Sequence, residues 1–302
     1  MNILVTGASG QIGSELVPFL RQQHGRNAVV IALHAYKKLA AELRDGPNVQ
    51  LDATDRSLLE RAIVKHQIDT VYHLVGVLSA RGEQNPELAW QTNMFSLKHV
   101  LDLSVTHHIR QIFWPSSIAA FGPTTPRENT SQRTVMEPST MYGVTKVAGE
   151  LLCNYYVKKF GLDIRSLRFP GIISYKTKPG GGTTDYAVDM FYHAITHQPY
   201  MCFVAPETVL PMMYMDDAIR AVDLLMKAPA DALTVRTSYN LTALHFSAAE
   251  LTAAIQRRKP DFRCGYVPDF RQQIADSWPK TIDDSQARKD WGWKPEFDLE
   301  RM

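Results

Sequence analysis

The stretch STMYGVTKVAGELL places a phenol and an ammonium four residues apart, at Tyr142 and Lys146. Residues with this spacing share one face of a helix. The neighbouring residues predict such a helix, because Ser139 or Thr140 can cap its start and Gly161 can end it. A tyrosine has a pKa of about 10 in water, so it needs help to act as a base at neutral pH. A nearby ammonium favours the phenolate, and the pair therefore predicts a proton-abstracting tyrosine, with a purely structural pair as the alternative.

A hydroxyl group precedes this pair in the chain. Ser117 ends the run QIFWPSS, whose apolar residues predict a buried strand. A tyrosine and a lysine at this spacing are common in proteins. The hydroxyl at the end of a predicted strand therefore strengthens the catalytic interpretation of Tyr142 and Lys146.

A second chemical signal lies near the N-terminus, where VTGASGQIG follows the first apolar run. Gly7, Gly10 and Gly13 stand immediately before SELVPFLRQQ, which predicts a helix. Glycine permits a tight turn and lets the backbone approach a pyrophosphate, whose charge the helix N-terminus stabilises. The stretch therefore predicts a dinucleotide site, and a glycine turn that only packs strand against helix is the alternative.

The residues after the next predicted strands bear on which dinucleotide binds. Dinucleotide folds usually carry an acid about 20 residues after the glycines, where it binds the ribose hydroxyls. Here AVVIAL ends in His34, and Lys37 and Lys38 follow closely. A carboxylate would repel a 2′-phosphate, whereas histidine and lysine would tolerate one, so NADP stays open beside NAD. Asp52, in VQLDATD, can receive the adenine amino group, unless Asp52 or Thr54 simply caps the next helix.

The order of elements predicts the fold that would hold these groups. Apolar or β-branched runs recur through residues 1–172 and alternate with segments of helical periodicity. This alternation predicts an α/β fold with a Rossmann-type, doubly wound parallel sheet covered by helices on both faces. From residue 173 the pattern loosens around a glycine-rich loop, KTKPGGGTTDY. Residues 173–302 therefore predict a smaller, mainly substrate-binding lobe of one compact unit, with some strands and helices interleaved.

Composition narrows the class of partner. With 33 basic and 31 acidic residues the formal charge is +2, which argues against nucleic acid as the main partner. The cysteines Cys153, Cys202 and Cys264 show no metal-binding spacing, and neither His107 nor His108 has a partner at ligand spacing, so no metal is expected. The start of the chain carries no basic leader segment, and no apolar run reaches about 18 residues. These features predict a cytoplasmic protein with no membrane partner.

The strings VTGASGQIG, PSSIAAFG and YGVTK together resemble the extended short-chain dehydrogenase/reductase family, whose members use a Ser/Thr, Tyr and Lys triad on a Rossmann fold. The strings LSARGE, RFPGIIS, PGGGTTDYAVDMF, LPMMYMDDA, SYNLTALHFS, IADSWPK and DDSQARKDWGW resemble the L-threonine 3-dehydrogenase branch of that family. The resemblance runs from Ile3 to about Leu299. It implies a homodimeric, NAD-dependent enzyme of threonine catabolism that oxidises L-threonine at C3 to L-2-amino-3-oxobutanoate.

Carried over position by position, the resemblance implies roles for three groups of residues. Tyr142 would take the proton of the substrate's 3-hydroxyl, Ser117 would orient that hydroxyl, and Lys146 would also hold the nicotinamide ribose. The other implied contacts with the cofactor are Gly7, Gly10, Gln11, Ile12, Gly13, His34, Asp52, Ala53, Leu74, Val75, Asn93, Pro170 and Ile172. The implied contacts with the amino acid, besides Ser117 and Tyr142, are Ser79, Gly182, Thr183, Thr184 and Trp278.

The sequence departs from the branch at two places, and other functions stay open. Members of the branch usually carry aspartate at the position of His34 and continue for a short segment beyond DLERM. A nucleotide-sugar epimerase or dehydratase would use the same triad, and a redox sensor or scaffold would bind the dinucleotide without turnover. The predicted substrate residues have ordinary turn, loop or core roles as alternatives. Asp216 and Asp217 predict no chemistry, only a cap for the helix that follows them.

Overall fold

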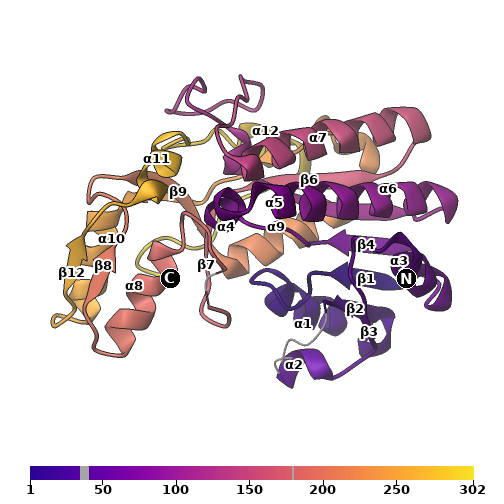
Figure 1. Ribbon diagram of the computed structural model, residues 1–302, viewed down its shortest axis with the longest axis horizontal. Helices are drawn as coiled ribbons and strands as arrows, with labels where there is room; N and C mark the ends of the chain where they lie inside the picture. The colour runs from indigo at the N-terminus through magenta and orange to yellow at the C-terminus, as the bar shows by residue number, and fades with distance from the viewer. Residues whose placement is uncertain (35–40, 179) are drawn as a thin grey trace.

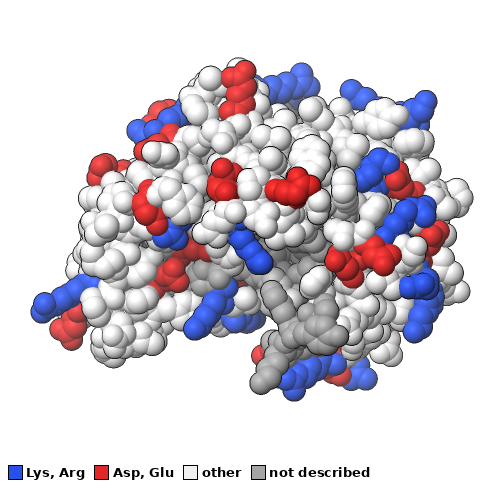
Figure 2. Space-filling model, viewed as in Figure 1, with Lys and Arg blue, Asp and Glu red and all other residues white. Residues whose placement is uncertain are grey.

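The computed structural model describes residues 1–34, 41–178 and 180–302 of the chain. Lys37 and Lys38, which bear on the choice of cofactor, lie outside the described residues. No helix within those ranges is both long enough and apolar enough to cross a bilayer. On the face shown in Figure 2, basic and acidic side chains are interspersed, in keeping with their near balance in the sequence.

A seven-stranded parallel sheet in the order β10-β6-β5-β4-β1-β2-β3 forms the centre of the fold (Figure 1). Its strands are β1 (Ile3–Thr6), β2 (Val29–Leu33), β3 (Asn48–Gln50), β4 (Thr70–His73), β5 (Gln111–Ser117), β6 (Ile164–Phe169) and β10 (Tyr239–Asn240). From β1 the chain builds outward in one direction through β2 and β3, and in the other through β4, β5 and β6. This order confirms the predicted Rossmann-type α/β fold and places a ligand-binding switch point between β1 and β4.

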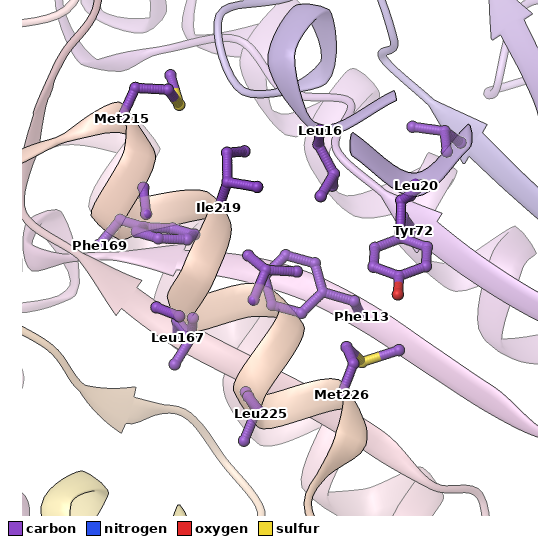
Figure 3. Packing of buried hydrophobic residues seen from close by; sticks show 14 of the residues in the cluster. Leu16, Leu20, Tyr72, Phe113, Leu167, Phe169, Met215, Ile219, Leu225 and Met226 are labelled. Atoms are coloured by element: carbon purple, nitrogen blue, oxygen red, sulfur yellow. The ribbon is translucent and has the colours of Figure 1, made fainter. Parts of the chain in front are cut away.

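Helices cover both faces of the sheet. On one face, Ile3 and Val5 of β1 point into a core closed by helices α1 and α9 (Figure 3). On the other face, Leu4 points into a core closed by α3, α6 and α7. The helices of the fold are α1 (Gly13–His24), α2 (Ala41–Arg44), α3 (Arg56–Lys65), α4 (Ser79–Gln84), α5 (Pro86–Trp90), a π-helical turn (Gln91–Phe95), α6 (Ser96–Thr106), α7 (Met141–Phe160), α8 (Tyr186–Ile195), α9 (Met215–Lys227), α10 (Ala248–Arg258), α11 (Phe270–Asp276) and α12 (Ser285–Trp291).

The C-terminal lobe encloses a third core. It contains two small sheets, β11-β9-β7 and β12-β8, together with α8, α10 and α11. The strands of these sheets are β7 (Gly171–Ile173), β8 (Tyr200–Cys202), β9 (Val209–Tyr214), β11 (Leu244–Ser247) and β12 (Cys264–Tyr266). Residues after 173 also return to the central sheet, because β10 pairs with β6 and α9 packs on it (Figure 1).

Helix α7 carries the predicted tyrosine and lysine, and its ends follow from local chemistry. The Thr140 hydroxyl accepts a 3.1 Å hydrogen bond from the Gly143 N–H and caps the first turn. Gly161 ends the helix in the left-handed conformation, with φ of +70°. Gly149 brings the helix close to the sheet, because a Cβ there would lie 2.5 Å from the Trp114 ring. The helix is therefore held tightly against β5.

Candidate active site

Ser117, Tyr142 and Lys146 meet at one end of a cleft between the central sheet and the C-terminal lobe. Ser117 is the last residue of β5, and the other two residues lie in the first turns of α7. The Ser117 hydroxyl is hydrogen bonded to the Tyr142 phenol. The Lys146 Nζ lies 5.2 Å from the centre of the Tyr142 ring and donates a 2.5 Å hydrogen bond to the Pro115 carbonyl. The end of β5 therefore supplies a partner to each member of the predicted pair.

Burial governs the pKa values of this pair. It raises the pKa of Tyr142 to about 12, and the hydrogen bond with Ser117 acts in the opposite direction. Burial also lowers the pKa of Lys146 to about 7, against the interactions with Glu150 and Cys153, which raise it. Desolvation thus disfavours the charged form of both groups. That the lysine, together with the positive ring of an oxidised nicotinamide, makes Tyr142 a usable base stays a prediction.

A cavity of about 140 Å³ adjoins the cluster, and we name it the inner cavity. It contains all the residues that the resemblance assigned to the amino acid and part of those assigned to the cofactor. These lining residues are Gln11, Ile12, Leu74, Val75, Ser79, Ser117, Tyr142, Lys146, Pro170, Ile172, Gly182, Thr183, Thr184 and Trp278. The fold thus brings together residues from separate parts of the chain, from Gln11 to Trp278.

The part of the inner cavity that Ser79 and the glycine loop line is polar and is fixed by hydrogen bonds. The Ser79 Oγ lies 3.0 Å from the Thr183 Oγ1 and accepts a 3.2 Å hydrogen bond from the Thr183 N–H. The Gly181 and Gly182 N–H groups donate to the Asp185 carboxylate at 2.8 and 2.7 Å. The glycine loop is therefore tied to the helix that follows it. Sequence reasoning overlooked Asp185, although a carboxylate so soon after three glycines is a recognisable anchor.

Trp278 belongs to a core and also borders the inner cavity. It is only 4 % exposed and packs in the core of the C-terminal lobe, and it also lines the inner cavity. Its carbonyl accepts a 3.0 Å hydrogen bond from the Arg127 Nε. The segment between β5 and α7 therefore holds this wall in place.

A second cavity, of about 660 Å³, extends from the glycine turn to the carboxyl ends of β2 and β3, and we name it the outer cavity. The predicted cofactor residues that line it are Gly7, Gly10, His34, Asp52, Ala53, Leu74 and Val75. Leu74 and Val75 line both cavities, so one cleft runs from Asp52 to Trp278. It crosses the ends of β1 and β4, where the sheet order reverses.

The glycine turn fits the diphosphate of a dinucleotide. Gly7 has a φ of +70°, and a Cβ there would lie 2.8 Å from the Leu74 carbonyl carbon. At Gly10 the nearest atom to a Cβ would be the Gly7 oxygen at 3.2 Å, and Gly10 lines the outer cavity. Because the turn leads into the N-terminus of α1, a phosphate can approach its backbone closely and be stabilised there.

The far end of the outer cavity is open to solvent. The His34 Nε2 lies 3.6 Å from the Asp52 Oδ2, and these side chains are 74 % and 48 % exposed. The Asp52 carboxylate accepts hydrogen bonds of 2.8 and 2.7 Å from the Thr54 N–H and hydroxyl. Partial burial raises the pKa of Asp52, but the bonds from Thr54 and the nearness of His34 outweigh it and lower the pKa. The next helix, α3, is capped by Asp55, so the alternative of a cap at Asp52 or Thr54 is wrong.

Two predicted cofactor residues lie away from both cavities. Gly13 begins α1, and a Cβ there would lie 2.6 Å from the Gly7 oxygen, so it serves the packing of helix against turn. Asn93 is buried in the π-helical turn. Its side chain accepts a 2.7 Å hydrogen bond from the Val77 N–H and donates to the Val77 carbonyl and the Thr145 hydroxyl at 3.2 and 3.0 Å. Asn93 therefore positions the chain after β4 rather than facing the cleft.

Fold and cleft define a class of protein: a Rossmann-type α/β protein with a site for a dinucleotide beside a Ser, Tyr and Lys cluster. Residues 3–242 match the NAD dependent epimerase/dehydratase family. The chain therefore belongs to this family, and the resemblance to the extended short-chain dehydrogenases/reductases is confirmed. An uncharacterized epimerase/dehydratase of Staphylococcus haemolyticus is 46 % identical over 99 % of this chain and 94 % of its own length.

Comparison with solved structures shows which members of the family this chain resembles. The holo form of a GalE-like L-threonine dehydrogenase from Cupriavidus necator is 50 % identical, with a TM-score of 0.96 over 99 % of this chain and 96 % of its own. A monomeric L-threonine 3-dehydrogenase from a metagenome database is 47 % identical, with a TM-score of 0.95 over the same shares. The resemblance to the L-threonine 3-dehydrogenase branch is confirmed, and the relatives suggest a nicotinamide dinucleotide as the cofactor.

Proposed function

We propose that this protein oxidises L-threonine at C3 to L-2-amino-3-oxobutanoate, with NAD as the cofactor. The observation that carries the proposal is one small cavity lined both by the Tyr142 cluster and by Ser79 and Thr183. Oxidation of a hydroxy amino acid requires both sets of groups. The Tyr142 cluster would take the proton of the hydroxyl, and Ser79 and Thr183 would hold the rest of the amino acid in place. The likeness to L-threonine dehydrogenases supports the same substrate.

In this proposal Tyr142 takes the proton of the 3-hydroxyl. Ser117, which is hydrogen bonded to the phenol, orients the substrate hydroxyl beside it. Lys146 is anchored on the Pro115 carbonyl and stabilises the phenolate that Tyr142 must form. Contacts with the carboxylate and the ammonium of threonine come from four other residues of the same cavity, Ser79, Gly182, Thr183 and Thr184. Trp278 keeps water away from the reacting hydroxyl.

The cofactor completes the site in two ways. A bound oxidised nicotinamide supplies the acceptor for the hydrogen and electron pair that leave C3, together with a positive charge. Gly7, Gly10, Gln11 and Ile12 would hold the diphosphate at the start of α1, and Lys146 would hold the nicotinamide ribose. Tyr142 needs that second positive charge, because burial raises its pKa to about 12 in spite of the hydrogen bond with Ser117. The alcohol becomes a ketone when it loses two hydrogens: the hydroxyl proton goes to Tyr142, and the hydrogen on C3 leaves with its electron pair.

The other proposed cofactor contacts follow the cleft outward. Leu74, Val75, Pro170 and Ile172 would flank the nicotinamide half, and His34, Asp52 and Ala53 the adenosine half. Gly13 and Asn93 would contribute indirectly, through the turn and the chain after β4.

A nucleotide sugar is the second candidate substrate, because the family includes epimerases and dehydratases. The inner cavity measures about 140 Å³ and must take the nicotinamide end of the cofactor as well as the substrate. Cavities for ligands of drug size usually measure about 300–1,000 Å³. The small cavity therefore favours an amino acid. A nucleotide sugar that raises the melting temperature while threonine does not would reverse this preference.

The experiment that tests the function is the absorbance of reduced nicotinamide, followed with purified protein and L-threonine in parallel reactions with NAD and with NADP. We expect reduction with NAD. Reduction only with NADP would leave the chemistry in place and change the cofactor. If neither is reduced, the substrate assignment fails.

We also propose that the protein is a cytoplasmic homodimer, joined by α6 and α7 of each chain in a four-helix bundle. Helix α7 exposes Val144, Leu151, Tyr155 and Phe160, with 56 % exposure at Leu151. One solved relative is described as monomeric, so the state of this chain needs a measurement of its own. Light scattering should give the mass of a dimer, and Leu151→Glu should give that of a monomer. A monomer before substitution contradicts the proposal.

A further inference from the structure

A buried ion pair lies directly beneath the catalytic cluster. Glu150 is one turn after Lys146 on α7 and is completely buried. Its carboxylate accepts hydrogen bonds from the Arg168 Nε at 2.9 Å and Nη2 at 2.7 Å. The same carboxylate accepts a 2.6 Å hydrogen bond from the Ser116 hydroxyl. Arg168 and Ser116 are paired residues on β6 and β5, so the pair joins helix α7 to two strands.

The position of Ser116 makes this contact relevant to the chemistry. Its neighbour Pro115 accepts the hydrogen bond of Lys146, and its other neighbour, Ser117, is hydrogen bonded to Tyr142. The bond from Ser116 to Glu150 thus fixes the short stretch of β5 that positions both groups. A shift of this stretch would move the phenol and the ammonium relative to each other.

The pair is also part of a satisfied polar network. The Arg168 Nη1 donates to the Asn240 Oδ1 at 2.9 Å and to the Gln132 carbonyl at 3.1 Å. The Asn240 side chain donates in turn to the carbonyls of Thr130 and Asp283. Buried ion pairs often contribute no more stability than apolar residues of the same size. A role in the site therefore explains the pair better than stability does.

We propose that Glu150 is a positioning residue of the active site. Its carboxylate holds the carboxyl end of β5 through Ser116 and places a negative charge one helical turn from the Lys146 ammonium. This inference rests on the proposed function for its effect on turnover, but its effect on Lys146 is independent of any reaction.

The charged and titratable groups around Lys146 make that effect measurable. On α7 they are Tyr142, Glu150 and Cys153, on β4 His73, and on β6 Arg168, the partner of Glu150. Burial lowers the pKa of His73 to about 3 and raises that of Cys153 far above neutral, so both stay neutral between pH 5 and pH 9. An arginine stays cationic throughout this range. Lys146 is therefore the group around Glu150 that titrates there.

The first measurement is a double-mutant cycle of stability against pH, without substrate or cofactor. Urea unfolding gives the free energy of unfolding of each protein at each pH. The wild type is compared with Lys146→Met, and Glu150→Gln is compared with the double variant Glu150→Gln/Lys146→Met. Stability of the wild type relative to Lys146→Met rises with pH above the pKa of the folded lysine, which burial lowers to about 7. With Glu150→Gln we expect this rise to begin about one pH unit lower, because the lysine loses an opposite charge. If the rise begins at the same pH with and without Glu150, the proposed effect of the Glu150 charge on Lys146 is wrong.

A second variant is available in case Glu150→Gln does not fold. Glu150→Gln leaves Arg168 without a carboxylate, so Glu150→Gln/Arg168→Gln replaces it if the single variant does not fold. This pair removes both charges and keeps hydrogen-bonding side chains at the two positions. The expected shift has the same direction and is smaller, because loss of the positive charge of Arg168 acts in the opposite sense on Lys146. An onset above that of the wild type would contradict the proposal.

The second measurement is turnover of L-threonine. For Glu150→Gln we expect kcat to fall about 10- to 100-fold, with KM within about threefold, because small displacements of reacting groups cost rate rather than affinity. Ser116→Ala is the matched control: it keeps both charges, so we expect a reduced kcat and an unmoved pH onset. Full kcat in both variants would overturn the positioning role. If no form of the protein oxidises threonine while the onset shifts, the proposed function fails and the link between Glu150 and Lys146 stands.

Discussion

The two ends of the cleft are built in opposite ways. At the inner end, Tyr142 and Lys146 are 8 % and 6 % exposed, and the end of β5 holds both of them. At the outer end, His34 and Asp52 are mostly in water, 3.6 Å apart, with exposures of 74 % and 48 %. Burial at the inner end moves pKa values by several units, whereas an exposed pair is screened and contributes little. We therefore expect the inner end to determine the chemistry and the outer end to bias only the choice of cofactor.

Replacing Tyr142 should give the largest effect and tests the inner end directly. Tyr142→Phe removes the proton acceptor and keeps the ring, so we expect kcat for L-threonine to fall about 10³-fold or more. Binding of NADH, followed by its fluorescence, should change by less than about threefold. The melting temperature serves as the control for folding. Turnover close to that of the wild type would remove Tyr142 from its proposed role.

Ser117 should give a smaller effect at the same end. Ser117→Ala loses the hydroxyl beside Tyr142, and we expect kcat to fall about 100-fold, within the range found for groups that assist proton transfer. Ser117→Thr keeps the hydroxyl and should stay within about tenfold of the wild type. Steady-state kinetics of both variants decide the matter. An equal fall of kcat in Ser117→Ala and Ser117→Thr would show that the hydroxyl of residue 117 does not assist the reaction.

The two ends of the cleft can also be compared through the pH dependence of the free energy of unfolding, with buried His73 and exposed His34 as the two test residues. Buried His73 hydrogen bonds to the Thr6 and Ser96 hydroxyls at 2.7 and 3.0 Å, and burial lowers its pKa to about 3. Between pH 6.5 and pH 3 the folded state binds fewer protons than the unfolded state, so the free energy of unfolding falls as the pH falls. The slope reaches about 1.4 kcal/mol per pH unit.

A pair of variants isolates this contribution of His73. His73→Gln should be less stable at pH 7, because it loses both hydrogen bonds, but its stability should decline less below pH 6.5. The exposed His34→Gln, which removes no buried hydrogen bond, should change the acid limb far less than His73→Gln does. Urea unfolding between pH 4.5 and pH 7.5 measures both. An acid limb that is equally steep in His73→Gln would show that another group controls it.

The smallest effect is expected at the outer end. His34→Asp places a carboxylate where a 2′-phosphate would lie, and we expect the ratio of kcat/KM for NAD over NADP to rise by up to about tenfold. The kcat with NAD should not change, because His34 is remote from the reacting groups. Kinetics with each cofactor in turn provide the measurement. A changed kcat with an unchanged ratio would contradict this division between the ends.

Sequence reasoning succeeded where the signal was local. The alternation of strands and helices predicted a doubly wound parallel sheet, and the spacing of Tyr142 and Lys146 predicted their common face on α7. The glycine turn was recognisable for the same reason, because the strand, the turn and the helix follow one another directly in the chain.

It failed where partners are distant in the chain. Asp217 was expected to cap its own helix, but it is buried and accepts hydrogen bonds from the Glu296 and Phe297 N–H groups, which no local pattern announces. Glu150 was overlooked although it lies one turn after Lys146, because its meaning depends on the register that sets Ser116 opposite Arg168. The sequence also could not show how far burial raises the pKa of Tyr142, because burial depends on the whole fold.

The pairing of β10 with β6 has a consequence for how the protein is made. On a ribosome, β6 is complete once Phe169 has been added, but its neighbour arrives only with Tyr239 and Asn240. Through the synthesis of residues 170–238, the nascent chain therefore holds a nearly finished sheet with one unpaired border and without α9 to cover its face. An unpaired strand border favours association between chains. Slow translation over this interval should therefore lower the yield of folded protein, whereas slow translation after Asn240 should not.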